Sequence, residues 1–194
     1  MTERARIRVR QDEASVYASR ADFHTIFNED LKELYQLSFL LTRDPAKAQR
    51  CLVVGLEDCV KGNRVFREWA RSWAKRVIVQ NAIREMKPRP IQSNSPLGAM
   101  LSDEDQHARG LGGHFEIDAV LQLSDFDRFV FVMSALEHYS EHECALLLGC
   151  SARDIRVGRT RALLELADSH HMERSDNQPV VPGKSEMTIL CNRC

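Results

Sequence analysis

The fold is decided at residues 141–156, which read EHECALLLGCSARDIR. A helix-turn-helix that binds DNA needs a small residue where its two helices cross, a glycine in the turn, and a β-branched residue that fixes the second helix. Ala145, Gly149 and Ile155 supply these residue types at suitable spacing. The pattern predicts a helix-turn-helix. A short helical hairpin whose arginines are only solvated is the alternative, because such spacing also occurs by chance.

The second helix of this motif is basic. Its four arginines and two carboxylates give a net charge of +2, whereas the whole chain has a formal net charge of −1. Arginine neutralises phosphates and makes bidentate contacts with guanine. The candidate DNA-binding residues of this helix are Ser151, Arg153, Arg156, Arg159, Thr160 and Arg161.

Apolar residues recur with a helical period along the rest of the chain, and strand-like alternation is scarce, so the predicted fold class is all-α. Before the motif we expect three helices, over residues 22–41, 45–60 and 63–87, that form a compact bundle. Asp22 and Asp44 stand at the first two starts as N-caps.

Residues 88–115 are rich in proline, glycine and acidic residues, which is typical of a flexible linker. The expected organisation is a helical bundle at 22–87, this linker, a helix-turn-helix module at 116–172 and a loose tail at 173–194. Within the second module, the expected helix starts are Ser124 with Asp127, Ser140 with Glu143, and Ser151, whose helix should reach about Met172.

Composition excludes several classes of protein. The chain has no apolar run near the roughly 20 residues that cross a bilayer and no apolar segment typical of an export signal, so we expect a cytoplasmic protein. We then expect its six cysteines to be reduced thiols. No catalytic or phosphate-binding motif is present, so we expect neither an enzyme nor a cofactor nor a small-molecule substrate.

A metal site is not expected either. Cys191 and Cys194 have the spacing of a zinc knuckle, but no second pair matches them. They could form a redox dithiol or could be an accident of the tail.

Residues 123–166 resemble the promoter-binding C-terminal region of bacterial sigma factors of the extracytoplasmic-function type. The matching motifs are Leu123-Ser124, Tyr139-Ser140-x-x-Glu143, Leu148-Gly149-x-Ser151 and Arg161-Ala162-Leu163. The resemblance implies that this region grips the upstream promoter element. Gly158 stands where the family commonly has another arginine, which would reduce the phosphate contacts and weaken the helix by about 1 kcal/mol relative to alanine.

The first module is similar to the polymerase-docking region of the same family. Residues 34–48, LYQLSFLLTRDPAKA, follow its opening helix and turn. Where the family usually has an acidic pair and a glutamine that dock on RNA polymerase, this chain has Gln49, Arg50 and Val53.

Residues 73–80, WAKRVIVQ, resemble the helix that opens and reads the downstream promoter element. By resemblance the DNA-contacting residues there are Trp73, Arg76, Gln80 and Arg84. Residues 64–87 hold seven basic and two acidic side chains, a net charge of +5. Trp69 and Trp73 could instead be core residues, with the basic residues on the solvated side.

The resemblance therefore implies a sigma-factor-like transcription initiation protein with two partners, promoter DNA and the RNA polymerase core. An anti-sigma protein is a further candidate partner, and a membrane is not. The alternative is a degenerate homologue without polymerase docking, which acts as a protein-interaction adaptor or a plain DNA-binding regulator. The residues at positions 49, 50 and 53 favour that alternative.

Overall fold

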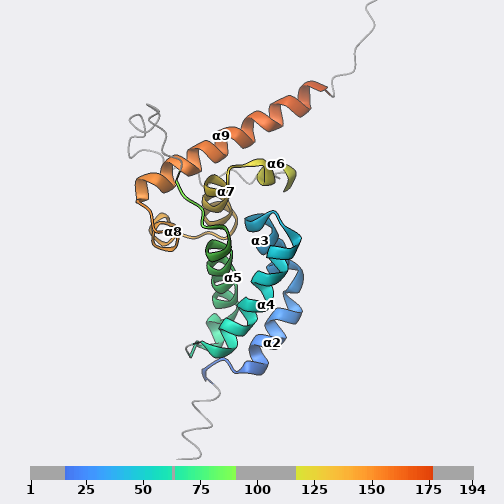
Figure 1. Ribbon diagram of the computed structural model, residues 1–194, viewed down its shortest axis with the longest axis vertical. Coiled ribbons are helices and arrows are strands. Elements are labelled where there is room, and N and C mark those ends of the chain that lie inside the picture. Colours follow the sequence, from blue (N-terminus) through green and yellow to red (C-terminus); the bar gives the residue numbers. More distant parts are fainter. Residues whose placement is uncertain (1–15, 63, 91–116, 177–194) are drawn as a thin grey trace, which may run out of the picture.

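The computed structural model describes residues 16–62, 64–90 and 117–176 (Figure 1), with the side chains of the last range described to residue 168. These residues are almost entirely helical and contain no β-strand, so the predicted all-α class is confirmed for them. Their one isolated β-bridge joins Tyr17 to Phe66. Most of the expected linker and tail lies outside the described residues.

The N-terminal helices surround a central helix, α5. The N-terminal group consists of α2 (Arg20–Glu29), α3 (Leu31–Thr42), α4 (Pro45–Lys61), the short 3-10 helix η1 (Arg67–Trp69) and α5 (Ala70–Met86). In Figure 1, α5 stands beside α3, α4 and α2, and it packs against all three. The expected second helix is confirmed: the Asp44 carboxylate accepts hydrogen bonds from two backbone N–H groups of the first turn, and Gly62 ends the helix.

The other two N-terminal expectations need correction. The single helix expected over residues 22–41 is two helices that meet at Asp30, and the side chain of Asp30 is bound by Arg71 of α5. The first N-cap is Ser19, whose hydroxyl accepts from the N–H of Asp22, while the Asp22 carboxylate accepts from the N–H of Ser19. The expected N-cap Asp22 is therefore the fourth residue of a capping box.

The helix expected from residue 63 begins later. Residue 63 lies outside the described residues, and the chain after it is extended, because the N–H of Ala18 donates to the carbonyl of Val65 at 2.8 Å. The helical hydrogen bonds begin after this pairing, with the 3-10 helix that starts at Arg67. The end was predicted correctly: α5 stops at Met86, before Pro88.

The C-terminal helices form a second group. They are α6 (Ile117–Gln122), α7 (Asp125–Phe131), the π-helical segment η4 (Val132–Leu136), α8 (Glu141–Leu148) and α9 (Ala152–Asp176). The helix α9 lies across α7 and runs past it (Figure 1). Ser124, Ser140 and Ser151 cap α7, α8 and α9 as predicted, and α9 extends four residues beyond the expected end at Met172.

The two groups of helices pack against each other. One part of the contact is made where α3 ends, and it contains Arg128 of α7, whose side chain is fully buried. Its guanidinium donates to the carbonyls of Leu41 at 3.1 Å and Leu123 at 3.0 Å, and to the carboxylate of Asp125 at 2.7 Å. The last carbonyls of a helix lack partners within the helix and carry its negative end, so a guanidinium stabilises the end of α3. Burial lowers the pKa of Arg128, and Asp125 opposes this shift.

Candidate nucleic-acid interface

The turn between α8 and α9 depends on Gly149. This residue has φ 66°, in the left-handed region, and the N–H of the following Cys150 donates to the carbonyl of Ala145 at 3.1 Å. No atom lies within 4 Å of a Cβ placed on Gly149, so the glycine is required by its backbone conformation and not by a close neighbour.

Two buried residues fix the helices on either side of this turn. Ile155 of α9 is 1% exposed, as the sequence predicts for the residue that holds the second helix. On α8 the fully buried residue is Cys144, whereas its neighbour Ala145 is only half-buried. Burial raises the pKa of the Cys144 thiol to about 12, so it stays protonated and packs as a small apolar group.

The first turns of α9 present the predicted reading surface. Ser151, Arg153 and Arg156 are exposed, and Arg156 also lies 3.5 Å from the carboxylate of Glu141. The Ser151 hydroxyl both caps α9 and donates to the carboxylate of Asp154 at 2.6 Å. Arg159 and Thr160 are half-buried, and the Thr160 hydroxyl donates to the carbonyl of Arg156.

Arg161 is placed differently from the other candidates. Its Nε and one terminal nitrogen donate to the two carboxylate oxygens of Asp127, at 3.0 Å and 2.6 Å. The Asp127 side chain is 3% exposed and that of Arg161 is 23% exposed. This bidentate pair joins α9 to α7, so the guanidinium that the sequence assigns to DNA is engaged inside the protein.

Gly158 belongs to the same contact. A Cβ on Gly158 would lie 2.9 Å from the Cε1 atom of Phe126 and 3.1 Å from a carboxylate oxygen of Asp127. The glycine therefore lets α7 approach α9 closely enough for Arg161 to reach Asp127. The sequence contained a signal for this contact, because Ile155, Gly158 and Ala162 are spaced so that they share one inward face of the helix.

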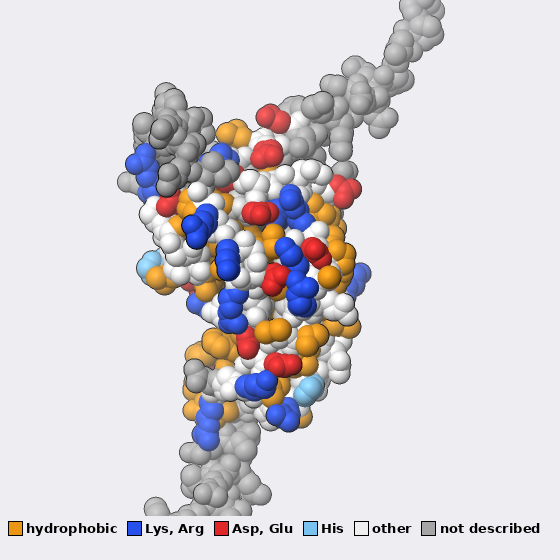
Figure 2. Space-filling view, in the orientation of Figure 1, with side chains coloured by type: hydrophobic (Ala, Val, Ile, Leu, Met, Phe, Trp, Pro, Cys, Tyr) orange, Lys and Arg blue, Asp and Glu red, His pale blue; other side chains and the backbone are white. Residues whose placement is uncertain are grey.

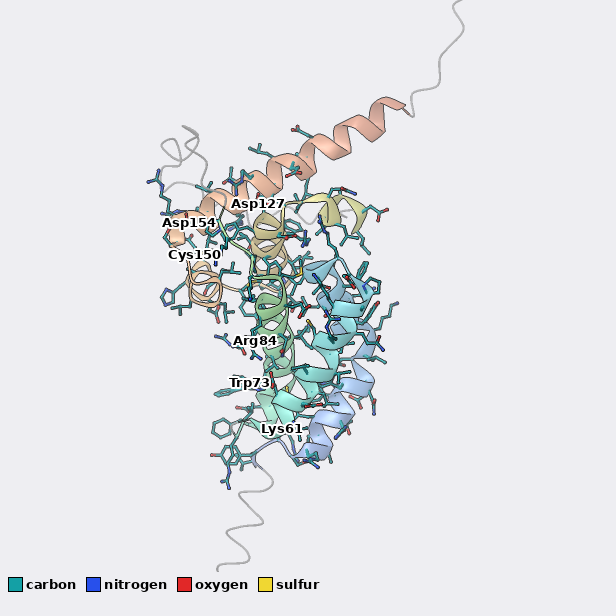
Figure 3. All side chains as sticks on the ribbon, in the orientation of Figure 1. Lys61, Trp73, Arg84, Asp127, Cys150 and Asp154 are labelled. Atoms are coloured by element: carbon teal, nitrogen blue, oxygen red, sulfur yellow. The ribbon has the colours of Figure 1, made fainter. Side chains whose placement is uncertain are left out.

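The second candidate surface lies on α5. Trp73, Arg76, Gln80 and Arg84 follow each other at intervals of three or four residues, so they share one face of the helix. Trp73 and Arg84 extend to the same side of α5 in Figure 3, the side on which α8 lies. Trp73, Arg76 and Gln80 are partly exposed. Arg84 is exposed, and its guanidinium donates to the carboxylate of Asp58 at 3.1 Å.

The two tryptophans have different surroundings. Trp69 is 59% exposed, so the alternative that it is a core residue is wrong. Its ring packs edge-on against Phe66, which in turn stacks on Tyr17 with ring centroids 4.9 Å apart. Trp73 is half-buried, and its buried Nε1 has no hydrogen-bond partner among the described residues. An exposed row of rings beside arginines is the composition of a surface that stacks unpaired bases.

The basic side chains of residues 64–87 are largely paired. Figure 2 shows Asp and Glu side chains between the Lys and Arg side chains on the face that it presents. Arg67 pairs with α2, Arg71 with α2 and Asp30, and Arg84 with α4. Lys75 and Arg76 differ, because their partners, Glu137 at 3.2 Å and Glu143 at 3.5 Å, come from the C-terminal helices.

A groove of about 520 Å³ lies between these two groups of helices. Trp69, Trp73, Lys75 and Arg76 line it on one side, and residues 136–139 with Glu143 line it on the other. The outline of the molecule is indented below α8 in Figure 2. Two hydrogen bonds from Ser140 lower the pKa of Glu143, and Arg76 adds to this shift, so the carboxylate is ionised at neutral pH.

The residues predicted to dock on polymerase lie on α4. Gln49, Arg50 and Val53 are all exposed, and Val53 is 55% exposed. Arg50 forms an ion pair with Glu85 of α5, which raises the pKa of Arg50. The three side chains therefore share an open surface, but the arginine already has a carboxylate partner.

No family model matches the sequence, and a search of the curated proteins found no relative. None of the helices in the described part of the chain is long and apolar enough to cross a membrane. Within the same residues, no three His, Cys, Asp or Glu side chains are grouped so that they could hold a metal ion. Cys191 and Cys194 lie outside the described residues.

Proposed function

We propose that this chain is a sigma-factor-like transcription initiation protein, which binds promoter DNA and brings the RNA polymerase core to it. The observation that carries the proposal is the geometry of α8 and α9. A left-handed glycine turn joins them, Ile155 is buried, and Arg153 and Arg156 are exposed in the first turns of α9. Recognition helices meet base edges with such N-terminal residues.

The arginines of α9 would have two different roles. Arg153 and Arg156 are the proposed reading residues, supported by their exposure at the start of the helix. Arg161 would act indirectly, because its pair with the buried Asp127 sets the orientation of α9 on α7. The linker expected at residues 88–115 lies mostly outside the described residues.

The N-terminal helices would contribute two surfaces. The exposed side of α4, with Gln49, Arg50 and Val53, is the proposed contact with polymerase. The face of α5 with Trp73 and Arg76 is the proposed contact with the downstream promoter element, supported by the neighbouring exposed rings of Trp69 and Phe66. The protein would work in the cytoplasm by binding and not by catalysis, and an anti-sigma protein would be a suitable regulator.

A second function is favoured by one specific contact. The ion pair of Arg50 with Glu85 occupies the position where the family usually presents an acidic pair to polymerase. A chain that uses this position internally could keep DNA binding and lose polymerase docking. It would then be a plain regulator or a protein-interaction adaptor.

The test combines two measurements on the full chain. The first is co-purification of the tagged protein with RNA polymerase core, and the second is selection from a randomised duplex pool with and without that core. The control is the double variant Arg153→Ala/Arg156→Ala, which leaves the buried residues of α9 in place. Selection without co-purification would identify a plain regulator. Failure to select any sequence under both conditions would overturn the proposed function.

A further inference from the structure

Two ion pairs connect the N-terminal and C-terminal helices across the groove beside Trp73. Lys75 faces Glu137, and Arg76 faces Glu143. The cations come from the proposed DNA-contacting face of α5, and the carboxylates come from the segment that leads into α8 and from α8 itself. The four side chains are partly exposed, between 17% and 43%.

Lys75 and Arg76 differ from the other paired basic side chains of this region in where their partners lie. The partners of Arg67, Arg71 and Arg84 all lie within the N-terminal helices, so these pairs would persist if the two groups of helices moved apart. Only Lys75 and Arg76 among the paired cations of this segment would lose their partners. Their pairing therefore depends on the packed arrangement of the two groups.

The carboxylates occupy the positions that phosphate groups would need. A phosphate and a carboxylate present similar anionic oxygens to lysine and arginine, so they compete for the same cation. Both residues are also held in place. The N–H of Glu137 donates to the carbonyl of Val132 at 3.0 Å, and Glu143 completes the capping box of α8 with Ser140. The capping box thus fixes the Glu143 carboxylate, and the hydrogen bond of Glu137 fixes the backbone that carries its side chain.

We propose that Glu137 and Glu143 compete with nucleic acid for Lys75 and Arg76 and thereby oppose its binding in the groove beside Trp73 in the free protein. This inference rests on the proposed function, because it takes the face of α5 as a nucleic-acid surface. Binding of a single strand would require the carboxylates to leave the two cations. The second group of helices would then act as a built-in inhibitor of the first.

The first experiment measures the accessibility of Trp73 in the groove, in the absence of DNA. The chain has two tryptophans, so Trp69→Phe leaves Trp73 as the only indole and its quenching by acrylamide reports access to the groove. Glu137→Lys should increase the quenching, because it places two ammonium groups opposite each other. The exchange Lys75→Glu/Glu137→Lys should return the quenching to the original level, because it restores the pair in reverse.

The second experiment measures binding of a fluorescent single-stranded DNA of mixed sequence, with Trp69 retained. Glu137→Gln/Glu143→Gln should bind roughly threefold to tenfold more tightly, as expected for the loss of two partly exposed pairs. Glutamine at position 143 can still accept from the N–H of Ser140 and preserve the capping box. The control is Glu33→Gln/Glu57→Gln, which removes two charges from α3 and α4, away from the groove, and should change the affinity little.

Three results would overturn the inference. Quenching that does not respond to Glu137→Lys would show that the pair does not limit access to Trp73. Quenching that responds while the Gln variant gains no more affinity than its control would show that the carboxylates do not compete with nucleic acid. If the groove responds but neither the original protein nor any variant binds single-stranded or duplex DNA, the proposed function fails, and the competition fails with it.

Discussion

Replacement of Gly158 by alanine should have two opposing effects on the free energy of unfolding. In an exposed helix the change would stabilise the protein by about 1 kcal/mol, because glycine loses more backbone entropy than alanine when the helix forms. Here the new methyl group would lie 2.9 Å from the Phe126 ring and 3.1 Å from the Asp127 carboxylate. Phe126 is 2% exposed and Asp127 is bound by Arg161, so neither can move away easily.

Overpacking of this kind costs about 1–3 kcal/mol. Subtracting the gain in helix propensity leaves a net destabilisation of about 0–2 kcal/mol, with the carboxylate contact favouring the upper half of that range. Urea unfolding followed by circular dichroism measures this difference in the free energy of unfolding. A stabilisation near 1 kcal/mol would refute the close contact, because only helix propensity would then be acting.

A double-mutant cycle tests the cause. Phe126→Leu removes the ring edge nearest to the new methyl group, so Gly158→Ala should cost less in that background than in the original protein. Gly55→Ala is the matched contrast in α4. Its methyl group would lie 2.7 Å from the Cδ1 atom of Ile78, which is also fully buried but can move this terminal methyl group by turning one bond, whereas the Phe126 ring must move as a whole. Equal costs at the two glycines would contradict the explanation.

Four further predictions concern the arginines of the chain. Arg156→Ala should weaken binding to a cognate duplex by about 1–3 kcal/mol and relax the preference at one base pair, measured with a randomised pool. Arg161→Ala should instead lower the free energy of unfolding and weaken binding to all duplex sequences alike, because α9 loses the pair with Asp127 that orients it on α7. Proteolytic cleavage between α5 and α6 should give two fragments that elute together from a sizing column, because buried Arg128 ties α7 to α3, and Arg128→Ala should let them separate. Arg50→Asp should strengthen capture by RNA polymerase core if α4 is the docking face, and unchanged capture would exclude that face.

The sequence predicted the features that depend on local chemistry. Caps made by Asp44, Ser140 and Ser151 appear where hydroxyl and carboxylate residues precede helical patterns, because a cap is formed within a few residues of chain. The left-handed turn at Gly149 follows from the same local reasoning. The burial of Ile155 follows from helical periodicity.

Features that depend on distant partners were not predictable in this way. Arg71 binds the side chain of Asp30, where α2 and α3 meet, from 41 residues further along the chain. No pattern near Asp30 in the sequence predicts that partner. Gly158 suggests a weakened helix when it is considered alone, and only the approach of Phe126 shows why a larger residue would not fit. The pairing of Lys75 with Glu137 likewise joins two helical groups whose contact no local pattern encodes.

The helix α7 connects the proposed reading helix to the N-terminal helices through two neighbouring charged residues. Asp127 holds Arg161 of α9, and Arg128 holds the carbonyl of Leu41 at the end of α3. Each of these two side chains is almost fully buried, so each would be strongly unfavourable without its hydrogen bonds. Rotation of α9 relative to α3 would take the Arg161 cation away from the buried Asp127 carboxylate or would remove the Leu41 carbonyl as one acceptor of buried Arg128, so it is costly while both contacts remain. The orientation of Arg153 and Arg156 relative to α3 is therefore set through α7, and a partner that disturbs the end of α3 would change the proposed contact of α9 with DNA.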